Sequence, residues 1–280
     1  HLLPELTTLE NILAPAFTTF RGFDVALAQF DLRTIQFVNP AFPRFFGLIS
    51  GTATLDSVWT DIRFRNADIT HRFEDAEPSR FTGNGRVTIG ETLLTYDLAV
   101  DAKPLSLTTV ARAYPEAELI YKGTYTGPLR LQGQADDLAV VTELVGPPGR
   151  LAYDGRVDAD SVGGYGYTGT LRFNDLDLRL LLDTATVPHT SLNGTIHLDV
   201  LGDSLPNWEG PFDLALDRSL VDSVRVYAGA RARMRFGGGR LRIDTMHVET
   251  ALLSATAQGG IGLMPGMRDS LAFTIAADSL

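Results

Sequence analysis

Hydrophobic and polar residues alternate with a period of two along most of the chain, a pattern typical of β-strands with one apolar face. In the segment 23–28, Phe23, Val25 and Leu27 alternate with Asp24 and two alanines. The same alternation predicts further strands over 85–89, 94–101, 151–157, 171–173, 196–200, 241–243 and 271–276. The chain is therefore expected to be mainly β, and one clean apolar face per strand favours an antiparallel sheet that buries a single side.

Helical spacing is confined to short pieces. Leu6, Leu9 and Ile12 are spaced as on one face of a helix, which Pro15 should end at about residue 14. A second apolar piece covers 178–182, with Asp177 as its expected N-cap. We expect one short helix per repeat.

A repeated unit organises these elements. Each copy has a leucine, then a short apolar segment, a proline and a Gly-Thr pair. The Gly-Thr glycines recur after 123 − 51 = 72 and 194 − 123 = 71 residues. The copies are Leu32, Pro43, Gly51-Thr52; Leu105, Pro115, Gly123-Thr124; and Leu176, Pro188, Gly194-Thr195. A fixed period of this size predicts an array of similar units.

The repeat divides the chain into four predicted segments. These are a helical lead-in over 1–22 that ends a preceding repeat, and β repeats over 23–104, 105–175 and 176–280. We expect the last repeat to be longer by at least one hairpin and truncated at its C-terminus. Since the chain begins with His1, we expect a piece of a longer protein. A closed barrel, a two-sheet sandwich and a sheet curled around a ligand all satisfy the alternation, and the repeat favours an elongated, stacked form.

Composition narrows the function classes. The net charge of −10 and the pI of about 4.9 oppose binding to nucleic acid. The absence of cysteine excludes disulfides, thiolate metal ligands and cysteine nucleophiles. No apolar run reaches the roughly 18 residues that predict a transmembrane helix, and no signal segment begins the chain.

Candidate chemical motifs have structural interpretations that fit better. The glycines of 164–169 match G-x-G-x-x-G, but a strand and not a helix is expected next, so a glycine-rich turn is favoured over dinucleotide binding. The five histidines lack metal-binding spacing, and His71 and His197 are interpreted as strand residues. Asp158 and Asp160 are interpreted as turn residues. We therefore expect no catalytic residues, no metal and no cofactor, and predict that the protein is not an enzyme.

The chain resembles the AsmA-like and TamB-type proteins of the diderm bacterial envelope, a bridge-like lipid-transfer family. The resemblance extends from Phe23 onward and depends on several β signatures in combination. They are Asp175-Leu176-Asp177-Leu178 followed by Leu180-Leu181-Leu182, Ser191-Leu192-Asn193-Gly194-Thr195, the run from Gly123 to Gly133, and Gly149-Arg150-Leu151 with Gly155. This resemblance implies a long, taco-like β-groove with an apolar floor.

The resemblance also implies a function and a place in the cell. The expected function is to carry phospholipid between the inner and outer membranes, supporting outer-membrane biogenesis from the periplasm. Acyl chains would be the ligand, an outer-membrane barrel protein a further partner, and an inner-membrane anchor would lie outside this chain. The candidate floor residues, taken from the alternation, are Val87, Ile89, Leu98, Val100, Leu129, Leu131, Leu171, Phe173, Ile196, Leu198 and Val200.

A second hypothesis from another class stays open. A structural or adhesive surface array that binds protein or glycan predicts a closed core and exposed aromatic clusters, for which Tyr165 and Tyr167 are the local candidates. A β-solenoid carbohydrate-active enzyme is a third, and requires two facing acids at hydrolytic spacing. The cross-section of the sheet distinguishes the first two hypotheses, because a groove leaves its apolar face open and an array fills it.

Overall fold

The computed structural model describes residues 19–34, 46–58, 60–90, 94–113, 123–134, 136–158, 165–182, 186–202, 205–222, 224–226, 231–250 and 253–277. The chain divides into two compact units, one formed by 1–115 with 125–135 and the other by 116–124 with 136–280. These units are not the predicted repeats, whose boundaries stay a prediction. The expected helix over 6–14 lies outside the described residues, and strand begins at Thr19, inside the predicted lead-in.

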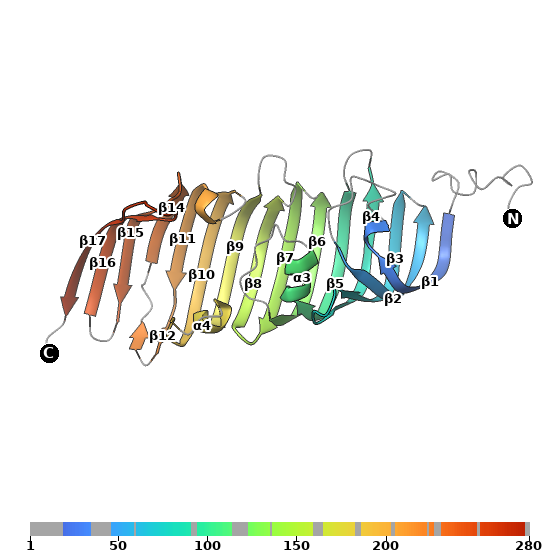
Figure 1. The fold of residues 1–280 in the computed structure, drawn as a ribbon, viewed down its shortest axis with the longest axis horizontal. Coiled ribbons are helices and arrows are strands. Elements are labelled where there is room, and N and C mark those ends of the chain that lie inside the picture. Colours follow the sequence, from blue (N-terminus) through green and yellow to red (C-terminus); the bar gives the residue numbers. More distant parts are fainter. Residues whose placement is uncertain are drawn as a thin grey trace, which may run out of the picture. The chain divides into compact units, whose positions relative to one another are not determined.

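The N-terminal unit is an antiparallel sheet whose strands pair in chain order (Figure 1). The strands are β1 (Thr19–Asp31), β2 (Leu48–Val58), β3 (Asp61–Arg72), β4 (Ser79–Ile89), β5 (Leu94–Ser106) and β6 (Thr124–Gln134). Helix α3 (Leu107–Ala113) follows β5. The buried hydroxyl of Ser106 accepts a hydrogen bond from the N–H of Thr109, so it caps the first turn of this helix.

The C-terminal unit is also antiparallel. Its strands are β7 (Asp137–Gly146), β8 (Gly149–Asp158), β9 (Gly166–Leu176), β10 (Thr190–Leu201), β11 (Gly210–Leu216), β12 (Ser219–Val221), β13 (Val224–Val226), β14 (Arg231–Gly237), β15 (Arg240–Glu249), β16 (Leu253–Gly262) and β17 (Ser270–Ala277). Pairing follows chain order from β7 to β11, and β14 then pairs with β11. From β14 to β17 it again follows chain order. The small β12–β13 hairpin pairs with β10.

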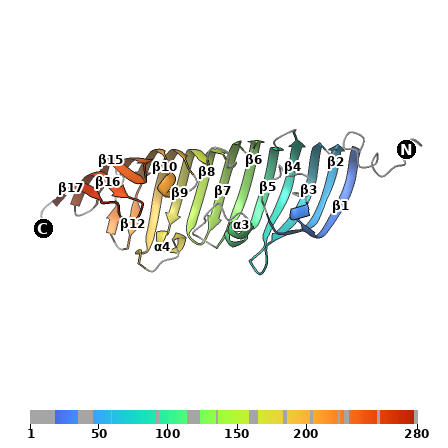
Figure 2. The same ribbon diagram turned by 45° about the horizontal axis from the view of Figure 1, so that its top comes forward.

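Helices are short in both units (Figure 2). In the C-terminal unit, α4 (Leu178–Leu181) has Asp177 as its N-cap, as predicted, and η2 (Leu205–Asn207) is a single 3-10 turn. In the N-terminal unit, Arg33 and Thr34 are helical after β1, and residues 35–45 lie outside the description. The mainly β class is confirmed, whereas one helix in every repeat stays a prediction. None of the helices described is long and apolar enough to cross a membrane.

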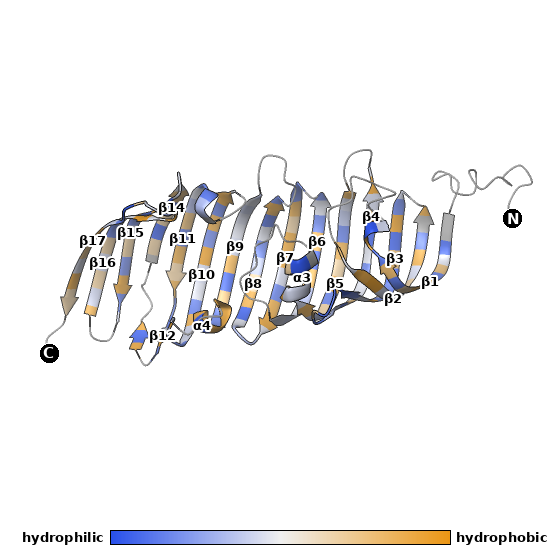
Figure 3. Ribbon diagram, viewed as in Figure 1, coloured by the Kyte–Doolittle hydropathy of each residue, from blue (hydrophilic) through white to orange (hydrophobic). Residues whose placement is uncertain are grey.

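The strand register divides each sheet into an apolar face and a polar face, because residues directly opposite each other point to the same side. In the N-terminal unit one row of the apolar face runs Phe23, Leu55, Phe64, Gly85, Leu98 from β1 to β5. In the C-terminal unit a row runs Leu198, Phe212, Met234, Ile243, Gly259, Leu271 from β10 to β17. Figure 3 shows the corresponding bands of alternating hydropathy along the strands.

Neither sheet closes on itself within the described residues. No pairing joins β1 to β6 in the N-terminal unit or β7 to β17 in the C-terminal unit, as far as the structure describes them. The strand β17 is exposed along its whole length, and Phe273 is 69% exposed. Each unit is therefore an open sheet with one apolar side.

Candidate functional site

The apolar faces are the first candidate site, and the register places the predicted floor residues of the N-terminal unit on one side of the sheet. Val87 lies opposite Tyr96, and both Leu98 and Val100 lie opposite glycines of β4. Ile89 shares this face, opposite Leu94. The side chains of all four predicted residues are partly exposed.

The two predicted floor residues of β6, Leu129 and Leu131, also lie on one side of their strand. Burial alternates along this strand, and Leu129 and Leu131 are on the more buried side while Arg130 and Gln132 are exposed. Tyr125 lies on the same side and is 2% exposed. The start of β6 is therefore packed, whereas the positions of Leu129 and Leu131 remain partly accessible.

The five predicted residues of the C-terminal unit also share one face. Leu171 lies opposite Ile196, while Phe173 lies opposite Gly194. Leu198 and Val200 follow along β10 on the same side. Phe173 and Val200 are each 3% exposed, and the other three side chains are partly exposed. These faces are thus less buried than the core of a layered domain.

The repeated Gly-Thr motif has a steric explanation in this sheet. A Cβ atom on Gly51 would stand 2.0 Å from the carbonyl oxygen of Asp68, and the φ of Gly51 is +142°. On Gly194 a Cβ would stand 2.3 Å from the carbonyl oxygen of Ala215 and 2.9 Å from the ring of Phe173. Glycine inside a strand marks a bend or a close approach of backbones, so the motif marks points where neighbouring strands crowd the apolar face.

Bulges provide a second source of curvature. The register shifts between Phe64 and Ala67, where Asn66 has a φ of +51° and its N–H donates to Oδ1 of Asn84 at 3.0 Å. In the C-terminal unit Asp175 has the same φ and its N–H donates to Oδ1 of Asn193 at 3.0 Å. A bulge bends its strand and increases the local twist, and an amide side chain of the next strand satisfies the freed N–H in both units.

Part of the C-terminal apolar face is filled by aromatic rings. The ring of Trp208, next to η2, lies 5.9 Å from Tyr167 and 5.3 Å from Phe236. Phe236 in turn lies 5.8 Å from Phe212, edge to face. Tyr165 is only 8% exposed and Tyr167 is partly exposed, so these tyrosines do not form an exposed aromatic patch.

The polar face of the N-terminal unit is organised by arginine and aspartate side chains. Arg80 donates two hydrogen bonds to Asp68, at 2.7 and 2.6 Å, and the pair holds the pKa of the Asp68 carboxyl below its usual value. Arg86 makes the same two-bond contact with Asp61 at 2.5 and 2.8 Å. These carboxylates are occupied by neutralising partners, which is the arrangement of a solvated structural face.

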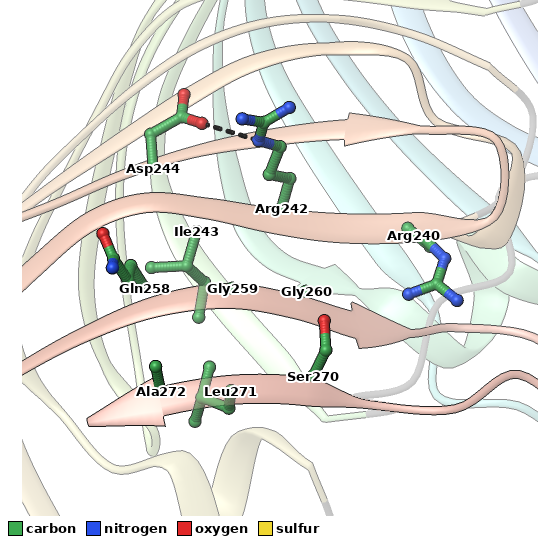
Figure 4. A pocket seen from close by; sticks show the side chains of 10 residues that line it. All are labelled: Arg240, Arg242, Ile243, Asp244, Gln258, Gly259, Gly260, Ser270, Leu271 and Ala272. Atoms are coloured by element: carbon green, nitrogen blue, oxygen red, sulfur yellow. Dashed lines mark ion pairs between the residues drawn. The ribbon is translucent and has the colours of Figure 1, made fainter.

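A recess in the C-terminal unit is the second candidate site (Figure 4). It has a volume of about 730 Å³ and lies over β15, β16 and β17. Its lining includes Arg240, Arg242, Gln258, Gly260 and Ser270. The sequence interpretation missed this group; the available signal was the run of five arginines without an acid over 231–242.

The motifs set aside in the sequence analysis occupy structural positions. Gly166 begins strand β9, and no helix follows the glycine-rich segment before Asp177. His71 and His197 are strand residues, and within the described residues no group of three or more acidic or histidine side chains is placed to hold a metal ion. Asp160 lies outside the described residues.

The comparisons with known proteins do not identify a family for this chain. A scan against protein-family models finds no match. Searches of curated proteins and of solved structures find no significant match either.

Proposed function

We propose that the apolar face of each unit is the floor of a β-groove that holds the acyl chains of lipid. The observation that carries the proposal is the incomplete burial of these faces. Nine of the eleven predicted floor residues are partly exposed, although they form continuous apolar rows across paired strands. An apolar surface of this kind in contact with water marks a binding site for an apolar partner.

The physical chemistry of acyl chains fits such a surface. Each CH₂ group gains about 0.8 kcal/mol when it leaves water, so a chain of a dozen or more carbons binds without any directional contact. Strands bent at Gly51, Gly194 and the two bulges would wrap this surface around the tails. The lipid headgroup would stay in water at the open side, and no catalytic group is required.

The resemblance to AsmA-like and TamB-type proteins suggests which lipid is carried and where. The protein would carry phospholipid between the inner and outer membranes of a diderm bacterium, working in the periplasm. An inner-membrane anchor outside this chain and an outer-membrane barrel partner belong to the same proposal. Its support within the chain is the repeated Gly-Thr unit, of which Gly51 and Gly194 lie at crowded points of the apolar faces.

Photo-crosslinking from adjacent residues tests the proposal. A photoreactive amino acid at Leu98 or Leu198 samples the apolar faces, whereas the same group at Asp97 or His197 samples the polar faces of the same strands. In cells with radiolabelled phospholipid we expect lipid adducts at the two leucine positions and none at the two polar positions. Mass spectrometry of the purified chain should find copurifying phospholipid.

Two results would overturn lipid carriage. One is the absence of lipid adducts at all four positions together with lipid-free protein. The other is equal labelling on both faces, which indicates contact with lipid by chance. Protein or glycan adducts at the leucine positions would instead support a surface array that binds those partners.

A further inference from the structure

A row of residues on the polar face of the C-terminal unit carries unbalanced positive charge. Arg235 of β14 lies directly opposite Arg242 of β15, which lies opposite Gly260 of β16, which lies opposite Ser270 of β17. Like charges opposite each other in a sheet are destabilising. The Arg235–Arg242 pair therefore does not serve the stability of the sheet.

Few acids offset this charge. Nε of Arg242 lies 3.1 Å from Asp244, and Nε of Arg233 lies 3.5 Å from Asp213. For Arg235 and Arg240 no acidic partner is recorded in the part of the chain that the structure describes. The chain as a whole has a net charge of −10, so this patch is opposite in sign to the rest of the protein.

Two polar groups converge over Gly260. A Cβ atom built on Gly260 would have Nη1 of Arg240 at 3.6 Å and Oγ of Ser270 at 3.8 Å as its nearest neighbours. Arg240 is held in place because its Nη1 donates to the carbonyl oxygen of Arg268 at 3.2 Å. The guanidinium and the hydroxyl thus stand on the same side of a residue without a side chain, as Figure 4 shows.

The recess described above lies at this position. It is an open depression of about 730 Å³, which leaves room for a phosphate group. Gly260 and Ala272 leave space on this face, while Arg242 and Gln258 add donors at its border and Asp244, which is paired with Arg242, adds one carboxylate. Arginine is the side chain best suited to bind phosphate, because its planar donors match two phosphate oxygens.

We propose that the recess over Gly260 is a binding site for a phosphate group, held by Arg240, Arg242 and Ser270. The site takes the phosphate of a small polar molecule or of a lipid headgroup. It does not depend on acyl-chain binding, because the arginine and serine side chains lie on the face opposite Ile243 and Leu271.

Phosphorus NMR of glycerol 3-phosphate titrated with the full chain tests the site. We expect saturable line broadening with the unchanged protein and binding weakened by about tenfold or more in Arg240→Gln/Arg242→Gln, since these charge-assisted hydrogen bonds are the strong ones. Gly260→Leu should weaken binding to the same extent, because the leucine side chain fills the recess. This variant leaves the charge of the site unchanged. Gly260→Ala should bind nearly normally, since its Cβ meets only ordinary contacts.

A matched control separates a built site from general charge attraction. Arg150→Gln/Arg156→Gln removes the same charge from exposed positions on β8 and should leave binding unchanged. Circular dichroism and thermal unfolding check that each variant is folded. The proposal is overturned if the control weakens binding as much as the recess variant, or if Gly260→Leu binds normally.

Vesicle sedimentation then identifies the source of the phosphate. Vesicles of phosphatidylcholine with phosphatidylglycerol that bind the protein, and bind Arg240→Gln/Arg242→Gln about tenfold less well, indicate a lipid headgroup. Line broadening with glycerol 3-phosphate but no vesicle binding indicates a soluble phosphate compound. Absence of both signals rejects the site, whatever the outcome of crosslinking at Leu98 and Leu198.

Discussion

Charges are paired differently on the polar faces of β3 and β4 in the N-terminal unit and of β14 and β15 in the C-terminal unit. In the N-terminal unit Asp61 and Asp68 each receive two hydrogen bonds from an arginine of the neighbouring strand. In the C-terminal unit Arg235 faces another arginine, Arg242. Arginines that are each paired with an aspartate need no ligand, whereas the Arg235–Arg242 pair, with Asp244 as its one recorded acid, would gain from binding an anion. The apolar faces, in contrast, follow one plan in both units, which indicates a common role for them and a local role for the arginines.

The largest effect is expected from charges placed on the apolar face. Leu129→Glu/Leu131→Glu should abolish copurification of phospholipid, because burying carboxylates under acyl chains carries a large desolvation cost. The chain should stay folded, since both positions are partly exposed. Mass spectrometry of bound lipid and thermal unfolding measure the two effects separately.

The matched control changes the other face of the same strand. Arg130→Glu/Gln132→Glu introduces the same two carboxylates at exposed positions and should retain lipid. Unfolding by the leucine variant alone would indicate a packed core at β6 and would count against a groove.

A smaller effect is expected on stability when alanine replaces a glycine of an apolar face and, for comparison, a glycine of the polar face. Gly51→Ala should lower the free energy of unfolding by on the order of 3 kcal/mol, because it combines a backbone clash with a strained φ. Gly260→Ala, which has room for its methyl group, should change it by no more than about 0.5 kcal/mol. Urea unfolding of both variants measures the difference, and equal destabilisation would contradict the steric explanation of the Gly-Thr motif.

The smallest effect is a pH dependence from the N-terminal unit. His71 is 3% exposed with Nε2 2.8 Å from the carbonyl oxygen of Phe46, and burial lowers the pKa of its imidazole. As the pH falls, His71 therefore gains its proton in the unfolded chain before it does in the folded one. Its contribution to the free energy of unfolding is fully present above the unfolded pKa of about 6.5 and is lost as the pH drops below that value.

Replacing His71, with His197 as the control, checks whether His71 causes this pH dependence. His71→Gln should remove the loss of stability that begins below the unfolded pKa, as measured by thermal unfolding across the pH range. His197→Gln is the control, because His197 is exposed on β10 of the other unit. If the loss of stability at low pH persists in His71→Gln, other groups cause it.

Alternation alone predicted the faces of the sheets and most strands. The register puts Leu98 and Val100 on one face of the N-terminal sheet, and Leu171 and Ile196 on one face of the C-terminal sheet, because side-chain direction has a period of two; their role as a lipid-binding floor stays a prediction. Asp177 was also predictable, since an acid before a short apolar run is an N-cap signal. Both the strand faces and the N-cap are set by residues close together in the sequence, so the sequence alone can predict them.

Long-range pairing decided the rest. The reason for the Gly-Thr repeat appears only when Gly51 meets the backbone of Asp68, and the recess exists only because strand pairing brings Arg240 to Ser270, thirty residues later in the chain. The chain by itself determined which residues share a face, because that is local stereochemistry. The tertiary structure decided which faces stay open and which charges lack a partner, because both depend on contacts between strands that alternation does not encode.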